Sequence, residues 1–283
     1  MKKYFSLIKF SHTIFAMPFA LIGFFLAAEI HGFAWITLLY VLLCMVFARS
    51  AAMAFNRYID RDIDRKNERT CNVREIPKGS ISAKNALIFV IINSLLFIII
   101  TYLINPICFA LSPVALIIIL VYSYTKRFTS LCHLILGLGL ALAPIGSYLA
   151  VSSEFNLIPI LFSTVVLFWV SGFDIIYSLQ DEKFDRKQKL HSIPVIIGKK
   201  NALQVAKFLH LLSIIILFAT GPIGEFRKLY WIGIVIFSIL LIYQHTLVKH
   251  NDLSKVNLAF FTTNGVASVL FGTLVICDIL YKI

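Results

Sequence analysis

Acidic residues are concentrated in two short segments of this chain. Of its 14 Asp and Glu residues, five lie between residues 60 and 75 and three lie between residues 181 and 185. A four-residue spacing occurs in both segments, which we call the first acidic motif (Asn56, Asp60, Asp64) and the second acidic motif (Tyr177, Asp181, Asp185). Because side chains four residues apart project from one side of a helix, each motif predicts a row of polar groups.

Carboxylates in such rows are suited to a hard cation. Mg²⁺ prefers oxygen ligands at roughly 2.0–2.1 Å and takes waters or phosphate oxygens as its remaining ligands. Two facing rows therefore predict a site that clamps a diphosphate through Mg²⁺. The catalytic metal ligands expected are Asp60, Asp64, Asp181 and Asp185, with the neutral oxygen of Asn56 beside them. Without a cation, four packed carboxylates would repel one another.

The alternative is a pair of solvated loops in which the acids form ion pairs with basic residues nearby in the sequence. Those neighbours are Arg57, Arg61, Arg65, Lys183 and Arg186. This interpretation suits a single acidic cluster. Two clusters with the same spacing favour the metal–diphosphate site, particularly because each comes at the end of an apolar segment.

The elements that must position these motifs are membrane helices. The chain is 59% hydrophobic and only 14% charged, its mean hydropathy is +0.88, and a soluble domain usually has roughly a quarter charged residues. Since roughly 20 apolar residues cross a bilayer as a helix, we predict an all-α bundle of about nine transmembrane helices. The predicted spans are 13–29, 34–55, 86–104, 107–124, 131–151, 156–178, 203–222, 229–247 and 257–280. The acidic motifs fall at the ends of the second and sixth spans, in loops 56–85 and 179–202.

The distribution of Lys and Arg predicts which side of the membrane holds the motifs. With the N-terminus in the cytoplasm, only Arg227, Lys228 and Lys282 of the 26 basic residues fall on the outer side, which leaves 23 on the inner side. This asymmetry is the one that the positive-inside rule requires. Both motif loops are therefore expected in the cytoplasm. A basic inner surface against anionic lipid accounts for the net charge of +12, so no nucleic-acid partner is predicted.

Cysteine spacing and the N-terminus add no further site. The five cysteines occur singly, without a C-x-x-C pair, which predicts neither a zinc site nor a disulfide framework. The first apolar segment is preceded by Lys9, Ser11 and His12, which suits a first membrane helix better than a cleaved signal peptide.

Two ionisable residues are predicted deeper than the motifs. Arg49 is seven residues before Asn56, so it lies two helical turns deeper on nearly the same face. Asp174 occupies the corresponding position before Asp181. Ionised groups at such depth are costly and usually functional, although Arg49 is near enough to the span end to extend to the interface. We expect both to contact substrate, with Asp174 either paired with a cation such as Arg49 or taking part in the chemistry.

Polar residues at the end of the fourth span form another candidate group. Lys126 and Arg127 follow Tyr122 in a Tyr-x-x-x-Lys pattern. Such cations at an inner helix end are often simple anchors, but beside a diphosphate they would stabilise the charge on a leaving group. We therefore expect these three residues, together with Tyr177, to bind substrate.

Both acidic motifs and the segments around them resemble the UbiA superfamily of intramembrane aromatic prenyltransferases. That family carries an N-x-x-x-D-x-x-x-D motif and a D-x-x-x-D motif, matched here at residues 56–64 and 181–185. Further matching segments are Lys9–Phe19, Ala48–Ala51, Arg69–Gly79, Tyr122–Arg127, Asp174–Asp181 and His191–Pro194. They extend over most of the chain and resemble the 4-hydroxybenzoate polyprenyltransferase branch most closely. Arg57 departs from the pattern, because many relatives have a second acid at this position.

The resemblance implies a nine-helix bundle with both motifs on inner loops, and a mechanism. Mg²⁺ and basic side chains draw diphosphate away from an allylic polyprenyl donor, the ring of a phenolic acid attacks the carbocation-like carbon, and a proton is lost. Some of the 39 aromatic residues would stabilise a cation or line a tunnel for the polyprenyl tail, and the rest would face lipid or fill the bundle.

We therefore predict a single-domain (1–283), Mg²⁺-dependent aromatic prenyltransferase of the cytoplasmic (inner) membrane. Its predicted partners are a polyprenyl diphosphate, an aromatic acid and the lipid bilayer, and its oligomeric state is left open. The expected acceptor is 4-hydroxybenzoate, as in ubiquinone biosynthesis, and a dihydroxynaphthoate on a menaquinone route is the alternative. A secondary transporter is a more distant alternative, because transporters bind substrate near the midplane on broken helices, whereas these acids cluster at one face.

Overall fold

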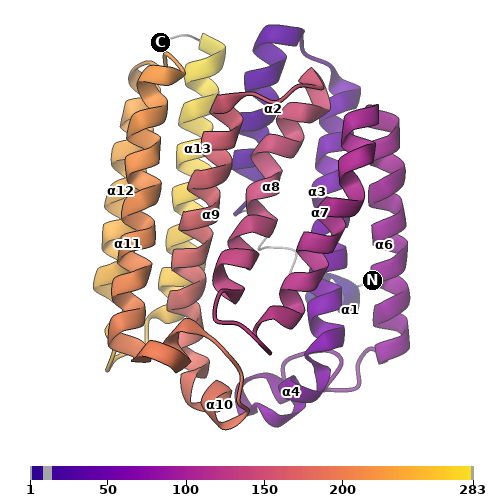
Figure 1. Ribbon diagram of the computed structural model, residues 1–283, viewed down its shortest axis with the longest axis vertical. Helices are drawn as coiled ribbons and strands as arrows, with labels where there is room; N and C mark the ends of the chain where they lie inside the picture. Colours follow the sequence, from indigo (N-terminus) through magenta and orange to yellow (C-terminus); the bar gives the residue numbers. More distant parts are fainter. Residues whose placement is uncertain (1, 9–14, 282–283) are drawn as a thin grey trace.

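The structure is a computed structural model that describes residues 2–8 and 15–281 of the chain. Within those residues, eight helices are long and apolar enough to cross a membrane, and α2 is a shorter apolar helix. These nine helices are α2 (Met17–His31), α3 (Trp35–Ile59), α6 (Ala83–Ile104), α7 (Pro106–Thr125), α8 (Cys132–Ser152), α9 (Leu157–Ser178), α11 (Ile193–Ile223), α12 (Lys228–Leu247) and α13 (Asn264–Tyr281). They lie side by side in one bundle (Figure 1). The predicted all-α membrane bundle is confirmed, and the chain is a multi-pass membrane protein.

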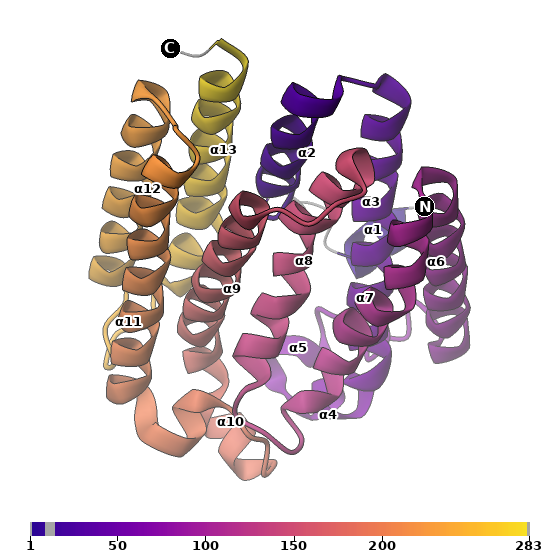
Figure 2. The same cartoon turned by 45° about the horizontal axis from the view of Figure 1, so that its top comes forward.

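Short helices occupy the turns between the long ones. Helices α4 (Arg61–Lys66) and α5 (Glu68–Cys71) follow α3, while the 3₁₀ helix η2 (Leu179–Asp181) and α10 (Glu182–Lys187) follow α9. Helix α1 (Lys2–Leu7) packs against α3, and a π-helix, η3 (Leu258–Thr263), leads into α13. Both α4 and α10 lie at the end of the bundle opposite to the C-terminus (Figures 1 and 2). The two acidic segments therefore meet at one end of the molecule.

Most predicted spans agree with the helices to within a few residues. The span predicted over 107–124, for example, is α7, Pro106–Thr125. Residues 13 and 14 of the first predicted span lie outside the described residues, as do residues 9–14 of the segment that resembles the start of the family.

The seventh predicted span, 203–222, agrees within a few residues with the part of α11 that follows a kink at Gly198, whereas the helix as a whole begins ten residues earlier, at Ile193. Pro194 stands in the first turn, where its missing N–H costs no hydrogen bond. Gly198 then adopts φ 77°, which kinks the helix and which glycine adopts without steric cost. Since the residues just after the kink are polar, hydropathy alone did not reveal the early turns. The predicted loops 56–85 and 179–202 thus contain the short helices and the first turns of α11.

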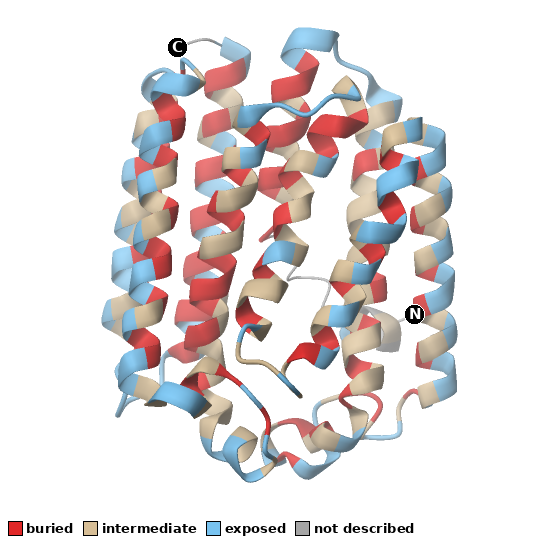
Figure 3. Cartoon of the chain, in the orientation of Figure 1, coloured by how far each residue is buried: buried red, intermediate tan, exposed pale blue. Residues whose placement is uncertain are grey.

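The core of the bundle is centred on α9, which packs against α8 and α11. The ring of Trp169 lies 5.4 Å from that of Phe19 and 5.6 Å from that of Phe237, between centroids, within one buried aromatic cluster. Figure 3 shows α9 as mostly buried, whereas α11 and α12 carry many exposed positions. Large apolar side chains such as Ile117 and Ile242 are more than half exposed. A surface of this kind suits lipid contact.

A glycine lets α8 and α9 approach each other closely. A Cβ atom at Gly137 would lie 2.4 Å from the carbonyl oxygen of Leu167 and equally close to Ser171 Oγ. An alanine at this position would therefore clash with α9 unless the backbone moved. The Ser171 hydroxyl lies within hydrogen-bonding distance of two backbone oxygens, that of Leu167 in α9 (2.6 Å) and that of His133 in α8 (3.1 Å). The contact with His133 fixes the start of α8 against α9, near Asp174.

Candidate functional site

The first acidic motif is built around a break in the helix. Asn56 lies in the last turn of α3, Asp60 follows the end of that helix, and Asp64 lies in α4. Backbone hydrogen bonds continue through the break, from Asp60 N to Asn56 O (2.9 Å) and from Asp64 N to Asp60 O (2.7 Å). The predicted four-residue register is therefore retained although α3 ends at Ile59. The second motif is broken similarly, since Asp181 ends η2 and Asp185 lies in α10.

Asp60 is almost fully buried and is paired with two cations that directly follow α7. Lys126 Nζ lies 2.6 Å from Asp60 Oδ2, and Arg127 Nη2 lies 3.3 Å from Oδ1. The Asn56 amide nitrogen also donates to Oδ2, at 3.2 Å. Lys126 and Arg127 therefore contact the motif directly rather than acting as interface anchors alone, and they remain about 30% exposed.

Asp64 is paired with a residue from the loop that follows it. Arg74 forms an ion pair with Asp64 Oδ2, and the Thr70 hydroxyl donates to the Asp64 backbone oxygen at 2.9 Å. Arg57, the residue that departs from the family pattern, is buried and donates to the Asn56 side-chain oxygen at 3.3 Å. That oxygen, predicted as a neutral metal ligand, is therefore already accepting a hydrogen bond.

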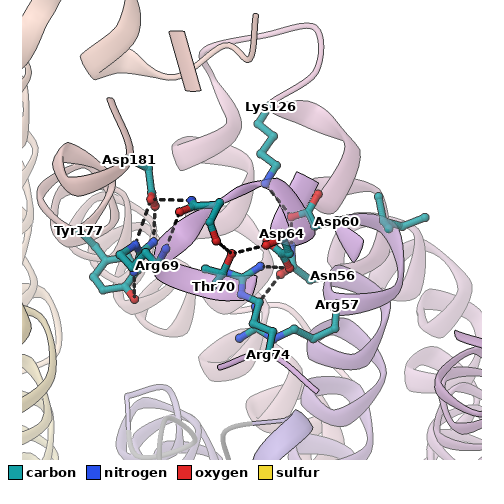
Figure 4. A network of polar contacts seen from close by, with 12 residues as sticks. Asn56, Arg57, Asp60, Asp64, Arg69, Thr70, Arg74, Lys126, Tyr177 and Asp181 are labelled. Carbon is teal, nitrogen blue, oxygen red and sulfur yellow. Dashed lines mark hydrogen bonds and ion pairs between the residues drawn. The ribbon is translucent and has the colours of Figure 1, made fainter. Parts of the chain in front are cut away.

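The two acidic motifs are joined across a sequence separation of more than a hundred residues. Arg69 of α5 donates through Nε to Asp181 Oδ1, at 3.0 Å, and pairs with the other carboxylate oxygen through Nη2. Its Nη1 donates to the Tyr177 hydroxyl at 3.0 Å, and the Asn67 amide donates to Asp181 at 3.2 Å. These contacts, shown in Figure 4, hold the segment that follows the first motif against the second motif.

The environment of Arg69 favours its charged form. Partial burial lowers the pKa of its guanidinium, but the charge of Asp181 and the hydrogen bonds to Asp181 and Tyr177 outweigh burial, so its pKa is raised. Arg69 therefore holds a fixed positive charge between the two loops.

Among the described residues, local ion pairs of the kind that the alternative interpretation predicts are formed by two acids outside the motif positions. Asp62 pairs with Arg61 at 3.8 Å and Glu182 with Arg186 at 2.8 Å. The partners of Asp60 and Asp181 come from segments far away in the sequence, and that of Asp64 comes from ten residues on. Asp185 makes no ion pair with any residue that the structure describes. The motif acids thus form a tertiary site.

The donor set of this site suits a hard cation bound together with a phosphate ligand. The motif carboxylates supply oxygen atoms from two sides. No three His, Cys, Asp or Glu side chains in the described ranges, 2–8 and 15–281, are grouped closely enough to hold a metal by themselves. Mg²⁺ typically takes one or two carboxylates and completes its shell with water and phosphate oxygens. The residues present therefore fit such an ion when a diphosphate accompanies it.

An apolar cavity of about 390 Å³ lies between α3, α6, α7 and α8. Its walls include Arg49 and Tyr122, which are on the side of the acidic motifs, and Phe155, which follows α8 at the opposite end. Arg49 is the one charged residue among the described residues that line it. Its Nε is buried without a hydrogen-bond partner, and it forms no ion pair with the described part of the chain. A cationic group thus faces an apolar space without a counter-ion.

Asp174 does not pair with Arg49, so that predicted option is wrong. Its Oδ2 lies 2.7 Å from Nδ1 of His133, a buried residue in the first turn of α8. The pairing follows from the close approach of α8 and α9 at Gly137, which brings the two side chains together. Arg49, on α3, faces the cavity instead.

Six residues that contact the site were not among the predicted site residues: Arg57, Asn67, Arg69, Thr70, Arg74 and His133. Arg69 and Arg74 lie in a segment that matches the family, and buried acids require cationic partners, but the sequence does not show which acid each cation meets. A signal for His133 was present, because it and Asp174 are ionisable residues inside apolar segments, and such residues usually pair.

The fold and the site define a polytopic helical membrane protein that holds a charged site at one end and an apolar cavity beside it. The sequence profile of the UbiA prenyltransferase family matches residues 16–266. The chain therefore belongs to the UbiA prenyltransferase family, which confirms the predicted class of prenyl transferase.

Individual relatives agree with this assignment. The 4-hydroxybenzoate octaprenyltransferase of Vesicomyosocius okutanii subsp. Calyptogena okutanii (strain HA) is 30% identical over 252 residues, covering 87% of this chain and 89% of that protein. The apo structure of a UbiA homolog from Aeropyrum pernix K1 is similar with a TM-score of 0.85 at 29% identity, covering 95% and 98% of the two chains. A UbiA homolog from Archaeoglobus fulgidus bound to GPP and Mg²⁺ shares the fold with a TM-score of 0.75 at 22% identity, covering 98% and 99%.

Proposed function

We propose that this protein transfers a polyprenyl group from an allylic polyprenyl diphosphate to an aromatic acid, 4-hydroxybenzoate, in quinone biosynthesis. The family and the names of relatives such as the Vesicomyosocius octaprenyltransferase support this reaction. One observation carries the proposal furthest. Arg49 forms no ion pair with the described residues and lines an apolar cavity. A site for an anionic aromatic ligand beside a hydrocarbon tail requires both features.

The donor diphosphate is proposed to bind between the two acidic motifs together with Mg²⁺, as the Archaeoglobus homolog binds GPP and Mg²⁺. Asp60 and Asp64 would hold the ion from one side and Asp181 and Asp185 from the other, with Asn56 nearby. Bound there, the ion neutralises diphosphate charge and makes it a better leaving group. The chain itself contributes Lys126, Arg127, Arg69 and Arg74, which already contact the motif acids.

These basic residues have a second proposed role once the donor is bound. Each is partly exposed, between 20% and 33% at the side chain, so each can reach a ligand oxygen as well as its carboxylate. Positive groups placed before the reaction stabilise the charge that develops on the departing diphosphate. Tyr177, whose hydroxyl accepts a hydrogen bond from Arg69, is proposed to contact the donor.

The polyprenyl tail is proposed to lie in the apolar cavity. Its volume, about 390 Å³, is within the range of roughly 300–1,000 Å³ typical of small-molecule sites. Most lining residues are small or aliphatic, and the aromatic residues that line the cavity are Phe97, Tyr122 and Phe155. The cavity reaches from Arg49 towards Phe155 at the other end of the bundle, a direction that suits an extended chain.

The acceptor is proposed to bind through its carboxylate to Arg49. A guanidinium binds a carboxylate through two parallel hydrogen bonds and stays charged when partly buried. Arg49 is about 10 Å along the helix from Asn56, so an acid held there would present its ring between the guanidinium and the diphosphate. Tyr122 lines the same cavity as Arg49, and Asp174 and Tyr122 are proposed to complete the acceptor site.

Identification of the product tests the reaction. Purified protein is incubated with one polyprenyl diphosphate, Mg²⁺, and 4-hydroxybenzoate and a dihydroxynaphthoate in equal amounts, and the products are separated by mass spectrometry. We expect prenylated 4-hydroxybenzoate, and its formation should stop with EDTA and resume with added Mg²⁺. Preferential prenylation of the naphthoate would move the protein to a menaquinone route. Formation of neither product, under conditions where an active relative works, would contradict the proposal and reopen the transporter interpretation.

The protein is proposed to lie in the cytoplasmic membrane with the acidic motifs and the N-terminus inside. In support, Arg227 directly precedes α12 and Lys228 is its first residue, and the connection from α11 to α12 lies at the end of the bundle opposite to both motifs (Figure 1). We expect a membrane-impermeant thiol reagent to label Glu154→Cys from outside intact cells, and Lys187→Cys only after permeabilisation. Labelling of Lys187→Cys in intact cells would reverse the orientation.

A further inference from the structure

The His133–Asp174 pair lies outside the set of residues that the proposed donor site uses. His133 begins α8 and its side chain is 3% exposed, whereas Asp174 lies within α9 and is 23% exposed. An ionisable pair inside two apolar helices is expensive to bury and marks a functional site by default. Asp174 is the more accessible of the two, so it is the member that can meet a ligand.

Two contacts orient the His133 ring. The backbone N–H of Ile193 points at Nε2, at 3.4 Å, and Nδ1 lies 2.7 Å from Asp174 Oδ2. Asp174 Oδ1 makes no hydrogen bond with any residue in the described ranges. One carboxylate oxygen of Asp174 is therefore held by His133, and the other is available to accept a proton.

The surroundings of Asp174 place it next to the acceptor site. Its carboxylate and that of Asp60 both interact electrostatically with the Tyr122 hydroxyl, and Tyr122 lines the cavity together with Arg49. Arg49 in turn interacts electrostatically with Tyr122. Asp174 is thus near the apolar space in which an aromatic ring held by Arg49 would lie.

The partners of the acids separate Asp174 from the motif residues. Asp60, Asp64 and Asp181 each form an ion pair with Lys or Arg, and such pairing lowers the affinity of a carboxylate for a proton. Asp174 has no Lys or Arg partner among the described residues and contacts the imidazole of His133 instead. Asp185 also lacks an ion pair within the described residues, so it is the competing candidate.

We propose that Asp174, positioned by His133, is the general base that takes the ring proton of the aromatic acceptor; this deepens the proposed function and rests on it. The ring carbon beside the hydroxyl forms a bond with the allylic carbon as the bond from that carbon to the diphosphate oxygen breaks, and diphosphate leaves with the electron pair. Asp174 Oδ1 then accepts the proton from the substituted ring carbon. The electron pair of that C–H bond restores the aromatic ring, and Asp174 later releases the proton to solvent.

An isotope effect tests this role directly. The acceptor 4-hydroxybenzoate is prepared with deuterium at both ring carbons beside the hydroxyl, and its rate is compared with that of the unlabelled acid. In the wild-type protein we expect a rate ratio near unity, because proton loss follows the slow ionisation. In Asp174→Asn we expect kcat to fall roughly 10²-fold, as for loss of a general base, and a clear primary isotope effect to appear because proton loss has become slow.

Variants of His133 distinguish a role in positioning Asp174 through a hydrogen bond from a role in filling space between α8 and α9. The side-chain nitrogen of asparagine can occupy the place of Nδ1, so His133→Asn is expected to keep the hydrogen bond to Asp174 and a rate ratio near unity. His133→Phe fills the space without a donor and is expected to show a reduced kcat and an isotope effect. If His133→Asn and His133→Phe show the same isotope effect, His133 does not position the base.

The outcomes distinguish failure of this inference from failure of the proposed reaction. If wild-type protein forms no prenylated aromatic acid, the proposed function itself is wrong. If wild-type protein forms it and Asp174→Asn keeps the wild-type rate without an isotope effect, only the inference is overturned. An isotope effect in Asp185→Asn but not in Asp174→Asn would overturn it in favour of Asp185. Mg²⁺-dependent binding of a non-reactive prenyl diphosphate analogue, unchanged in Asp174→Asn, verifies that this variant is folded.

Discussion

Replacement of Asp60 or Asp181 by asparagine is expected to reduce prenyl transfer at least ~10²-fold, the effect typical of losing one charged group that stabilises a leaving group. Asparagine preserves the shape of the side chain but removes the negative charge that holds the metal–diphosphate. The two residues belong to different motifs and different pairs, Asp60 with Lys126 and Asp181 with Arg69. Similar losses in both variants would therefore indicate that the motifs act on one ligand. The measurement is steady-state turnover of purified protein at saturating Mg²⁺.

Asp62→Asn is the matched control for these variants. Asp62 lies between Asp60 and Asp64, but its side chain is 69% exposed and pairs only with its neighbour Arg61. The same chemical change there should leave turnover within about twofold of wild type, since exposed pairs contribute little. Near-wild-type turnover in both Asp60→Asn and Asp181→Asn would contradict the assignment of the motif acids.

The second large effect is expected from Arg49→Lys. Lysine keeps the charge but loses the planar group that binds a carboxylate through two hydrogen bonds. We expect the KM for the aromatic acid to rise more than that for the prenyl donor. Loss of a charged hydrogen bond costs about 1.5–3 kcal/mol, which corresponds to a decrease in kcat/KM of roughly tenfold to more than a hundredfold.

Comparison of the two KM values separates three roles for Arg49. A rise in donor KM alone would place Arg49 on the diphosphate. Reduced yield and lower thermal stability without a preference for either substrate would indicate a structural role. An unchanged acceptor KM in a folded protein would contradict the proposal that Arg49 binds the carboxylate of the aromatic acid. Arg65→Lys serves as the control, because Arg65 is exposed beside the first motif and makes no ion pair with the described residues.

The sequence was sufficient to predict the elements of the fold and the residues of the motifs. Long apolar segments bounded by charged loops specify membrane helices almost independently of their neighbours, which is why eight or nine spans are readily located. The spacing within each motif is also a local property, and the register of Asn56, Asp60 and Asp64 is retained even though a helix ends among them. Hydropathy did not predict the first turns of α11, because Lys199 and Lys200 lower the mean hydropathy of that helical segment.

The partners of the motif residues could not be predicted because they depend on packing. Arg69 meets Asp181 across 112 residues of sequence, and no pattern in either segment specifies that contact. The pairing of Asp174 with His133 rather than with Arg49 depends on how closely α8 approaches α9, which Gly137 permits. The sequence identifies which ionisable residues lie within membrane helices, whereas the fold determines which of them form pairs.

The central claim is that both acidic motifs bind a single metal–diphosphate. Isothermal titration of purified protein with a non-hydrolysable prenyl thiolodiphosphate, with Mg²⁺ and with EDTA, tests it without any turnover. We expect binding with Mg²⁺, little binding with EDTA, and a loss of affinity of roughly tenfold or more in Asp60→Asn and in Asp181→Asn alike. Equal affinity in Mg²⁺ and EDTA, or a loss confined to the variants of one motif, would contradict the account.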